Sequence, residues 1–226
     1  MPTVLITGAN RGIGLELARQ YAADGWRVIA TCRNPGAADE LNEIDGDIDV
    51  YPLDVDDTST LDALVISLKG QTIDVLFNNA GININKVPSV GDIDYDAWAK
   101  TMETNVFAPI RVAWAFKDNV LDSSRKVMAF TSSLMGSIER NGGGNAVYRS
   151  SKTALNMAAH CLSLELADKG VTVALLHPGH VRTDMGGPNA PVTAVDSAAG
   201  MRNVIANLTP EDNGCFRNYD GTAFPW

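Results

Sequence analysis

The stretch Thr7-Gly8-Ala9-Asn10-Arg11-Gly12-Ile13-Gly14 decides the fold, because it follows a short apolar run and opens a helical pattern. A glycine-rich turn between a strand and a helix lets backbone N–H groups and the helix dipole hold a pyrophosphate. The spacing is TGxxxGxG rather than the commoner GxGxxG of dinucleotide-binding proteins. Glycine-rich turns also occur as plain strand–helix connections, so the place of this one after a first strand is what favours a nucleotide.

Outward from this turn, short β-rich apolar runs alternate with helix-period stretches along the chain. The predicted strands are Thr3–Thr7, Arg27–Thr31, Ile48–Pro52, Ile73–Phe77, Lys126–Thr131, Thr172–Leu176 and Gly214–Tyr219. The predicted helices are Gly12–Ala23, Ala37–Ile44, Thr58–Lys69, Ala97–Val120, Ala146–Lys169 and Thr193–Asn207. With right-handed crossovers, this alternation predicts an α/β fold, a doubly wound (Rossmann-type), mostly parallel seven-stranded sheet with helices on both faces. We find no linker, internal repeat or low-complexity tract, so residues 1–226 are predicted to form a single domain.

Composition narrows the class of protein. The chain has 18 basic and 27 acidic residues, a net charge of -9, which disfavours binding to nucleic acid or to anionic membranes. The three cysteines are dispersed, with no CxxC pair and no metal-ligand spacing, so we expect reduced thiols, no metal and a cytoplasmic protein. No apolar run approaches the roughly 20 residues that span a bilayer, and no export signal is expected.

Two further loops are predicted at the same edge of the sheet as the glycine turn. Asp54 and Val55 follow the third strand, where a carboxylate could accept a hydrogen bond from an adenine amino group. An Asp there is also a common turn or helix cap. Asn78-Asn79-Ala80-Gly81 follows the fourth strand and is equally compatible with simple turn chemistry. The coincidence of three such loops at the carboxyl ends of parallel strands favours nucleotide binding.

The end of the second strand indicates which of the two nicotinamide dinucleotides the protein binds. Enzymes that use NAD place a carboxylate there for the ribose 2′-hydroxyl, but residues 27–36 contain no Asp or Glu. Arg33 stands there instead, and Arg11 lies inside the glycine turn, so two guanidinium groups could converge on a 2′-phosphate. NADP(H) is therefore favoured over NAD(H). The alternative is that both arginines are solvated surface groups.

Acid–base chemistry is indicated at Tyr148 and Lys152, which are four residues apart on one helical face. The ammonium is expected to lower the pKa of the phenol and make it a usable proton donor or acceptor. Ser133, after the fifth strand, could hydrogen-bond a substrate carbonyl or simply cap a turn. Asn105 lies inside a predicted helix, where asparagine is unfavourable unless its side chain has a task.

Together, TGANRGIG, NNAG at 78–81, Asn105, Ser133, YRSSK at 148–152 and HPGHVRT at 177–183 resemble the ordered signature of the short-chain dehydrogenase/reductase superfamily. SSLMGSIERNGGG, YRSSKTALN and DGTAFPW look most similar to its C-factor-like branch. The resemblance implies hydride transfer between NADP(H) and a carbonyl or alcohol substrate.

The resemblance also implies residue roles. Tyr148 would be the acid/base, Lys152 would lower its pKa and grip the nicotinamide ribose, Ser133 would anchor the carbonyl, and Asn105 would hold a water linking Lys152 to solvent. The nucleotide would be bound by Gly8, Asn10, Arg11, Gly12, Ile13, Gly14, Arg33, Asp54, Val55, Asn79, Ala80, Gly81, Tyr148, Lys152, Pro178, Val181 and Thr183. Ser133 precedes Tyr148 by fifteen residues where many members have thirteen, so we expect a longer loop at Ser137–Asn145. Ser132 is the poorer candidate, because Ser133 keeps the SxxG register with Gly136.

Two other functions remain open. One is a nucleotide-bound, C-factor-like signalling or regulatory protein with little turnover, and the other is an epimerase or dehydratase, which uses a similar Tyr/Lys pair in longer chains. The apolar helix at Ala146–Lys169 further predicts a homodimer.

Overall fold

A parallel sheet forms the centre of the molecule, whose computed structural model describes residues 1–87 and 89–226. Its strands are β1 (Thr3–Thr7), β2 (Arg27–Cys32), β3 (Ile48–Pro52), β4 (Val75–Asn78), β5 (Val127–Thr131), β6 (Thr172–His177) and β7 (Cys215–Asn218). They are ordered β3-β2-β1-β4-β5-β6-β7, and every neighbouring pair is parallel. The predicted doubly wound α/β fold with seven strands is confirmed. The prediction of a single domain stays a prediction.

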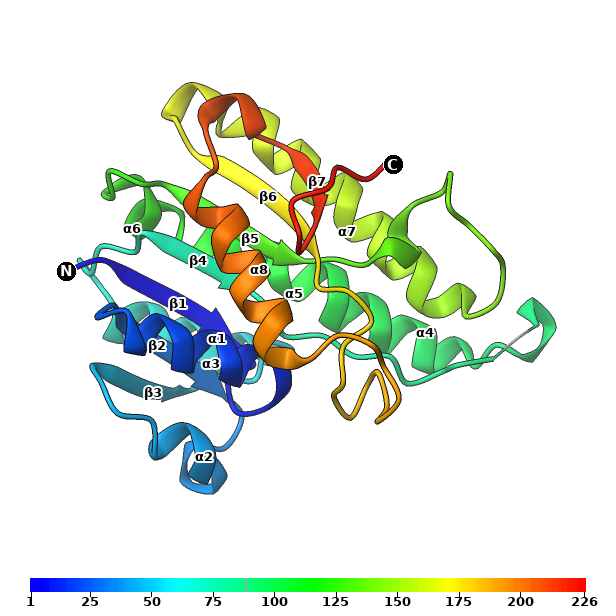
Figure 1. Cartoon of the computed structure of the whole chain (residues 1–226), viewed down its shortest axis with the longest axis horizontal. Coiled ribbons are helices and arrows are strands. Elements are labelled where there is room, and N and C mark those ends of the chain that lie inside the picture. The colour runs from blue at the N-terminus through cyan, green and yellow to red at the C-terminus, as the bar shows by residue number, and fades with distance from the viewer. Residues whose placement is uncertain (88) are drawn as a thin grey trace.

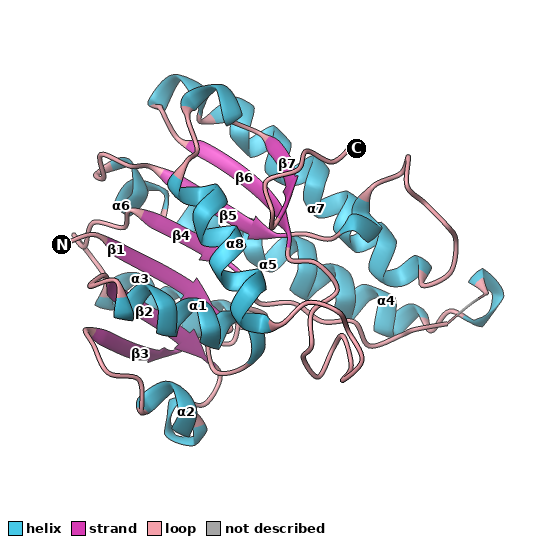
Figure 2. Cartoon of the chain, viewed as in Figure 1, coloured by secondary structure: helices cyan, strands magenta, loops and turns pink. Residues whose placement is uncertain are grey.

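Helices cover both faces of the sheet (Figures 1 and 2). They are α1 (Gly12–Ala23), α2 (Asp39–Asn42), α3 (Thr58–Ser67), α4 (Tyr95–Met102), α5 (Ala108–Ala115), α6 (Lys117–Leu121), α7 (Ala146–Glu165) and α8 (Ala194–Ala206). On β1, Val4 and Ile6 pack into the core beneath α1 and α8, whereas Leu5 between them packs into the core beneath α3, α5 and α7. Side chains of a strand alternate between faces, so a strand buried on both sides must be apolar throughout.

The strand arrows all point the same way in Figure 2, so the carboxyl ends of the strands form one edge of the sheet. The chain order reverses between β1 and β4, which are neighbours in the sheet. Connections that leave these two strands diverge to opposite faces and open a crevice, the usual ligand site of open α/β sheets. The glycine turn after β1 and the Asn-Asn-Ala-Gly loop after β4 flank this crevice.

Several element boundaries differ from prediction. The fourth strand begins at Val75 rather than Ile73, because the Ile73 N–H donates to the Asn119 carbonyl outside the sheet, at 3.0 Å. The helix predicted over Ala37–Ile44 shrinks to a 3-10 turn at Pro35–Ala37 and the single turn of α2.

The single helix predicted over Ala97–Val120 is wrong. The chain instead forms α4, a π-helical turn at Glu103–Phe107, then α5 and α6, with a break at Phe116. A π-helical turn inserts one residue into the helical ladder, and such turns are frequent at functional sites. Asn105 lies within it.

The described ranges, 1–87 and 89–226, contain neither a membrane-spanning helix nor a metal-binding cluster. None of the helices there has the length and apolar character needed to cross a membrane. No group of three or more His, Cys, Asp and Glu side chains in those ranges is placed to hold a metal ion.

Candidate active site

The glycine-rich turn has the shape of an anion cradle. Gly8 has a φ of +66°, a backbone conformation that favours glycine, and a Cβ at Gly14 would lie 2.1 Å from the Gly8 carbonyl oxygen. Within the described residues at the start of α1, no side chain caps the helix and no acidic residue lies in the first turn. The first N–H groups of α1 are therefore available to an anion, whose charge the helix dipole would stabilise.

Asn79 builds this cradle from the neighbouring strand. Its amide group donates to the carbonyl oxygens of Thr7 and Gly8, both at 3.1 Å. In return, the Thr7 hydroxyl oxygen accepts the backbone N–H groups of Asn79 and Ala80, at 3.0 and 3.1 Å. A Cβ at Gly8 would lie 3.1 Å from the Ala80 Cα, so these two loops are in close contact. The roles of Asn79, Ala80 and Gly81 toward an adenosine ribose stay predictions.

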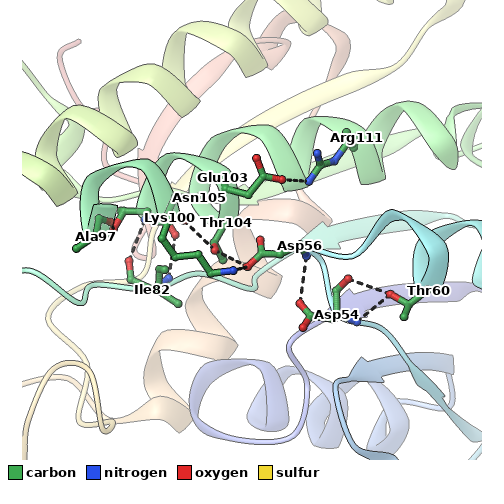
Figure 3. Close-up of polar contacts among 11 residues, drawn as sticks. Asp54, Asp56, Thr60, Ile82, Ala97, Lys100, Glu103, Thr104, Asn105 and Arg111 are labelled. Carbon is green, nitrogen blue, oxygen red and sulfur yellow. Dashed lines mark hydrogen bonds and ion pairs between the residues drawn. The ribbon is translucent and has the colours of Figure 1, made fainter. Parts of the chain in front are cut away.

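Asp54 and Val55 lie half-buried at the end of β3. The Asp54 backbone is fixed by Thr60, whose hydroxyl accepts from its N–H at 3.1 Å and donates to its carbonyl at 2.9 Å (Figure 3). The Asp54 side chain accepts the Asp56 N–H at 3.1 Å. The turn-capping role weighed for Asp54 is thus present, and a carboxylate has further lone pairs with which it could also bind adenine.

The two arginines are in different situations. Arg33 is exposed after β2. Arg11 forms an ion pair with Asp184 of the loop that follows β6, with 2.9 Å between Nη1 and Oδ2, and both side chains are mostly exposed. An exposed pair of this kind contributes at most about 1 kcal/mol, so Arg11 could exchange Asp184 for a phosphate at little cost.

The loop after β6 folds back over the glycine turn. Pro178 is buried, and its carbonyl accepts the Ser197 hydroxyl at 2.7 Å. Val181 forms a parallel bridge with Val192. The Thr183 methyl group lies 3.2 Å from the position of a Cβ at Gly12. Residues 181–192, all of them described, form turns and contain no helix, which agrees with the short connection seen in the sequence.

Ser133, Tyr148 and Lys152 come together from β5 and α7. Lys152 is 3% exposed, and its Nζ donates to the Thr131 carbonyl at 2.8 Å and lies 5.7 Å from the centre of the Tyr148 ring. Ser133 follows the end of β5, where its side chain is close enough to Tyr148 to lower the pKa of the phenol, and its Oγ accepts the Met135 N–H at 3.1 Å. The Ser132 hydroxyl instead donates to Asn156 Oδ1 in the interior. This difference supports Ser133 over Ser132 as the carbonyl anchor.

Burial shifts the pKa values of this pair in opposite directions. It raises the pKa of Tyr148 to about 12, an effect that the nearby Ser133 hydroxyl partly offsets, and it lowers the pKa of Lys152 to about 8. We expected Lys152 to lower the pKa of the phenol. In the structure Lys152 is not among the causes of the Tyr148 shift, and desolvation dominates, because it disfavours the charged form of both groups.

Asn105 joins the site through the π-helical turn. Its Oδ1 accepts the Ile82 N–H at 2.8 Å, and its Nδ2 donates to the Ile82 carbonyl at 2.9 Å (Figure 3) and to Ser151 Oγ at 3.0 Å. A Cβ at Gly81 would lie 3.2 Å from Asn105 Oδ1 and 3.6 Å from Lys152 Nζ. Asn105 and Lys152 thus face the same small space above Gly81.

Sequence reasoning missed several residues that build the site. Thr7 was quoted with the glycine-rich turn and Thr131 with a strand, but neither was given a role, although the Thr7 hydroxyl organises the turn and the Thr131 carbonyl receives Lys152. Asp56, Lys100 and Thr104 form a polar cluster beside Asn105 (Figure 3) that no motif indicated. Lys100 and Thr104 follow Asp56 by 44 and 48 residues along the chain. A local sequence pattern therefore carries no signal of their contact.

Comparison with known proteins identifies the family of the chain. A family described as short chain dehydrogenase matches residues 2–192. The C-signal protein of Myxococcus xanthus is 44% identical over 155 residues, which cover 68% of this chain and 93% of that protein.

Among solved structures, the carbonyl reductase Sniffer of D. melanogaster superposes with a TM-score of 0.94 at 34% identity, covering all of both chains. The NADPH-bound carbonyl reductase from chicken fatty liver gives a TM-score of 0.92 at 33% identity, covering 100% of this chain and 99% of that one.

Proposed function

Because the chain belongs to the short-chain dehydrogenase family and to its C-factor-like branch, we propose that it is an NADP(H)-dependent carbonyl reductase. One observation carries the proposal: Ser133, Tyr148, Lys152 and Asn105 converge at the carboxyl edge of the sheet, beside the glycine cradle. A protein with only a binding role would have no need of this arrangement.

The residues present fit a nicotinamide dinucleotide. The cradle between Gly8 and Gly14 would be filled by any Cβ at Gly14, and the uncapped start of α1 faces it. The residues assigned to the nucleotide are those of the glycine turn (Gly8, Asn10, Arg11, Gly12, Ile13 and Gly14), Arg33, Asp54, Val55, Asn79, Ala80, Gly81, Pro178, Val181 and Thr183, together with Tyr148 and Lys152. When bound, the cofactor supplies the hydride that reduces the carbonyl carbon.

The protein supplies the proton. With its pKa raised to about 12, the Tyr148 phenol is protonated at neutral pH and can donate to the carbonyl oxygen as that oxygen gains charge. Ser133 hydrogen-bonds to the same oxygen and orients it. Lys152 stands behind the phenol, and Asn105 borders the space through which Lys152 would exchange protons with solvent. The carbonyl thus gains a hydride at carbon and a proton at oxygen.

The arginines indicated by the sequence, Arg33 and Arg11, favour NADP(H) over NAD(H). The described residues from the end of β2 to Gly36 hold no carboxylate to receive a ribose 2′-hydroxyl, and Arg33 is exposed there. Arg11 would turn from Asp184 toward the phosphate. The solved structures support this choice, since one of the carbonyl reductases that match over the whole chain carries NADPH.

We also propose a small carbonyl substrate and a dimer. The loop after β6 is too short to enclose a substrate, and Met185 in that loop is exposed, so a shallow site with broad tolerance is expected. Helix α7 exposes Met157 and Leu164 by 65% and 66%, apolar surface that a second copy could cover. Light scattering at micromolar concentration should give twice the 24.1 kDa of one chain, and a monomer throughout would contradict the dimer.

A panel of carbonyl compounds, followed by cofactor absorbance with NADPH and with NADH, tests the activity. Tyr148→Phe should lose at least about a hundredfold in kcat, while nucleotide binding stays near normal, because only the proton-donating hydroxyl is removed. Tyr95→Phe, which changes an exposed tyrosine on α4, is the matched control and should be fully active. A Tyr148→Phe variant that keeps a tenth of the rate would end the assignment.

A signalling role is the second candidate, and the 44% identity to the C-signal protein favours it. The two functions differ in what Tyr148→Phe does. If signalling depends on a nucleotide-bound surface and not on turnover, Tyr148→Phe should keep the signalling activity of the wild type.

A further inference from the structure

A partly buried polar cluster links the loop after β3 to the π-helical turn. Asp56 directly follows Asp54 and Val55, and its Oδ2 lies 2.7 Å from Lys100 Nζ and 2.8 Å from the Thr104 hydroxyl (Figure 3). The Asp56 side chain is 15% exposed, and its other oxygen, Oδ1, is buried with no partner among the residues that the structure describes. A carboxylate held in this way is costly unless it is hydrogen-bonded, and Thr104 supplies that bond from the interior while Lys100, whose side chain is 53% exposed, supplies the counter-charge from the surface.

Thr104 is the centre of this cluster. It is 5% exposed, and its hydroxyl lies 2.8 Å from Asp56 Oδ2 and 3.1 Å from the Lys100 carbonyl, four residues earlier. A π-helical turn disturbs the regular backbone ladder, and a threonine hydroxyl can bond a carbonyl one turn back. The single hydroxyl hydrogen of Thr104 is shared between these two acceptors, of which the Asp56 carboxylate is the nearer, so Thr104 fastens the turn to the loop after β3.

The next residue, Asn105, fastens the same turn on the other side. Its side chain makes two hydrogen bonds with the backbone of Ile82, in the loop after β4. Adjacent residues of the π-helical turn thus hold two different loops of the sheet edge. The position of Asn105 therefore depends on its own bonds to Ile82 and Ser151 and on the attachment that Thr104 gives the turn beside it.

We propose that Thr104, Asp56 and Lys100 are positioning residues that hold Asn105 in register with Ile82 and Lys152. The effect of this cluster on catalysis rests on the function proposed above, whereas its effect on the position of Asn105 does not. The cluster also joins the two ends of the site, since Asp56 belongs to the loop assigned to adenine and Asn105 to the proton path.

The chain offers its own control. Glu103 lies on the same π-helical turn and forms an ion pair with Arg111 on α5 (Figure 3), with both side chains about one-third exposed. That pair connects the turn only to the following helix. Glu103→Gln therefore removes a charge from the turn without releasing it from the sheet.

Three variants at Thr104 and Glu103 test the idea by hydrogen exchange of the Ile82 amide, whose acceptor is Asn105 Oδ1. Thr104→Val keeps the shape and removes the hydroxyl, and it should exchange about tenfold faster than wild type. Thr104→Ser keeps the hydroxyl and should be near wild type, as should Glu103→Gln. If packing of the methyl group were what mattered, Ser would be the worse of the two replacements, and the proposal would be overturned.

Activity gives the second measurement. Thr104→Val should lower kcat about tenfold with little change in KM for the carbonyl compound, and Thr104→Ser should restore it. If Thr104→Val does not fold, Asp56→Ala, which removes the acceptor of the Thr104 hydroxyl from the other side, should show the same faster exchange at Ile82. A wild-type protein with no reductase activity would end the proposed function, yet the exchange of Ile82 would still decide the positioning role. Unchanged exchange in Thr104→Val refutes it.

Discussion

Lys152 holds an ammonium group at one of the most buried positions of the site, and Lys152→Met is expected to stabilise the fold while abolishing activity. The side chain is 3% exposed, and burial lowers its pKa from 10.5 to about 8. At pH 7 the folded protein therefore keeps a charge that its interior disfavours. A fall of that size corresponds to about 3 kcal/mol of free energy, since each pKa unit is worth about 1.36 kcal/mol.

The pH dependence of the free energy of unfolding follows from whether the folded or the unfolded chain holds the Lys152 proton. Between about pH 8 and 10.5 the unfolded chain still binds the Lys152 proton and the folded chain has released it. The free energy of unfolding therefore rises with pH across this window. Below pH 8 both states are protonated, and the burial penalty is then felt in full.

Methionine has a similar length and no charge, so it removes the penalty without leaving a large cavity. It also removes the donor to the Thr131 carbonyl, which costs about 1–2 kcal/mol. We expect a net gain of about 1–2 kcal/mol at pH 7, or a rise in Tm of about 2–8 °C, given about 2–4 °C per kcal/mol for a chain of this size. The gain should shrink as the pH rises from 8 to 10.

Thermal unfolding of wild type and variant, followed by circular dichroism at several pH values, makes the measurement. Lys86→Met is the matched control, because Lys86 is exposed and also donates to a backbone carbonyl, that of Met185, at 3.1 Å. It should show neither the gain nor its pH dependence. A Lys152→Met protein that is less stable than wild type at pH 7, or whose stability difference stays constant from pH 8 to 10, would refute the reasoning.

Three other substitutions probe the remaining parts of the site. Gly81→Ala would place a methyl group 3.6 Å from Lys152 Nζ, and we expect kcat to fall about tenfold in a carbonyl-reduction assay while Tm stays close to that of wild type. Gly14→Ala would place one 2.1 Å from the Gly8 carbonyl oxygen, so fluorescence titration should show NADPH affinity reduced by at least about tenfold, and unchanged affinity would contradict the cradle. Arg33→Asp should move the ratio of dissociation constants toward NADH by at least about tenfold, and equal wild-type affinities for both cofactors would show that Arg33 does not bind the 2′-phosphate.

The sheet could be predicted because its signal is local. Each strand buried on both faces is a continuous apolar run, as at residues 3–7, and glycine-rich or polar turns mark where strands end. Boundaries were less accurate where a backbone group finds a partner outside the sheet, as Ile73 does. The π-helical turn could not be predicted, because α-helical and π-helical stretches share the same composition. Asparagine at position 105 was the one local sign that the helix was irregular there.

The electrostatics of the site were also beyond sequence reasoning. The Tyr148–Lys152 spacing correctly placed both residues on one helix, but spacing says nothing about desolvation, which moves the two pKa values apart to about 12 and about 8. Two groups whose environments separate their pKa values are typical of acid–base sites. Here the separation stabilises the neutral form of each group. A neutral phenol is the form that gives a proton to a carbonyl oxygen, whereas alcohol oxidation needs a tyrosinate, which burial disfavours. Under the proposed function, burial therefore keeps Tyr148 in the form that carbonyl reduction uses at neutral pH.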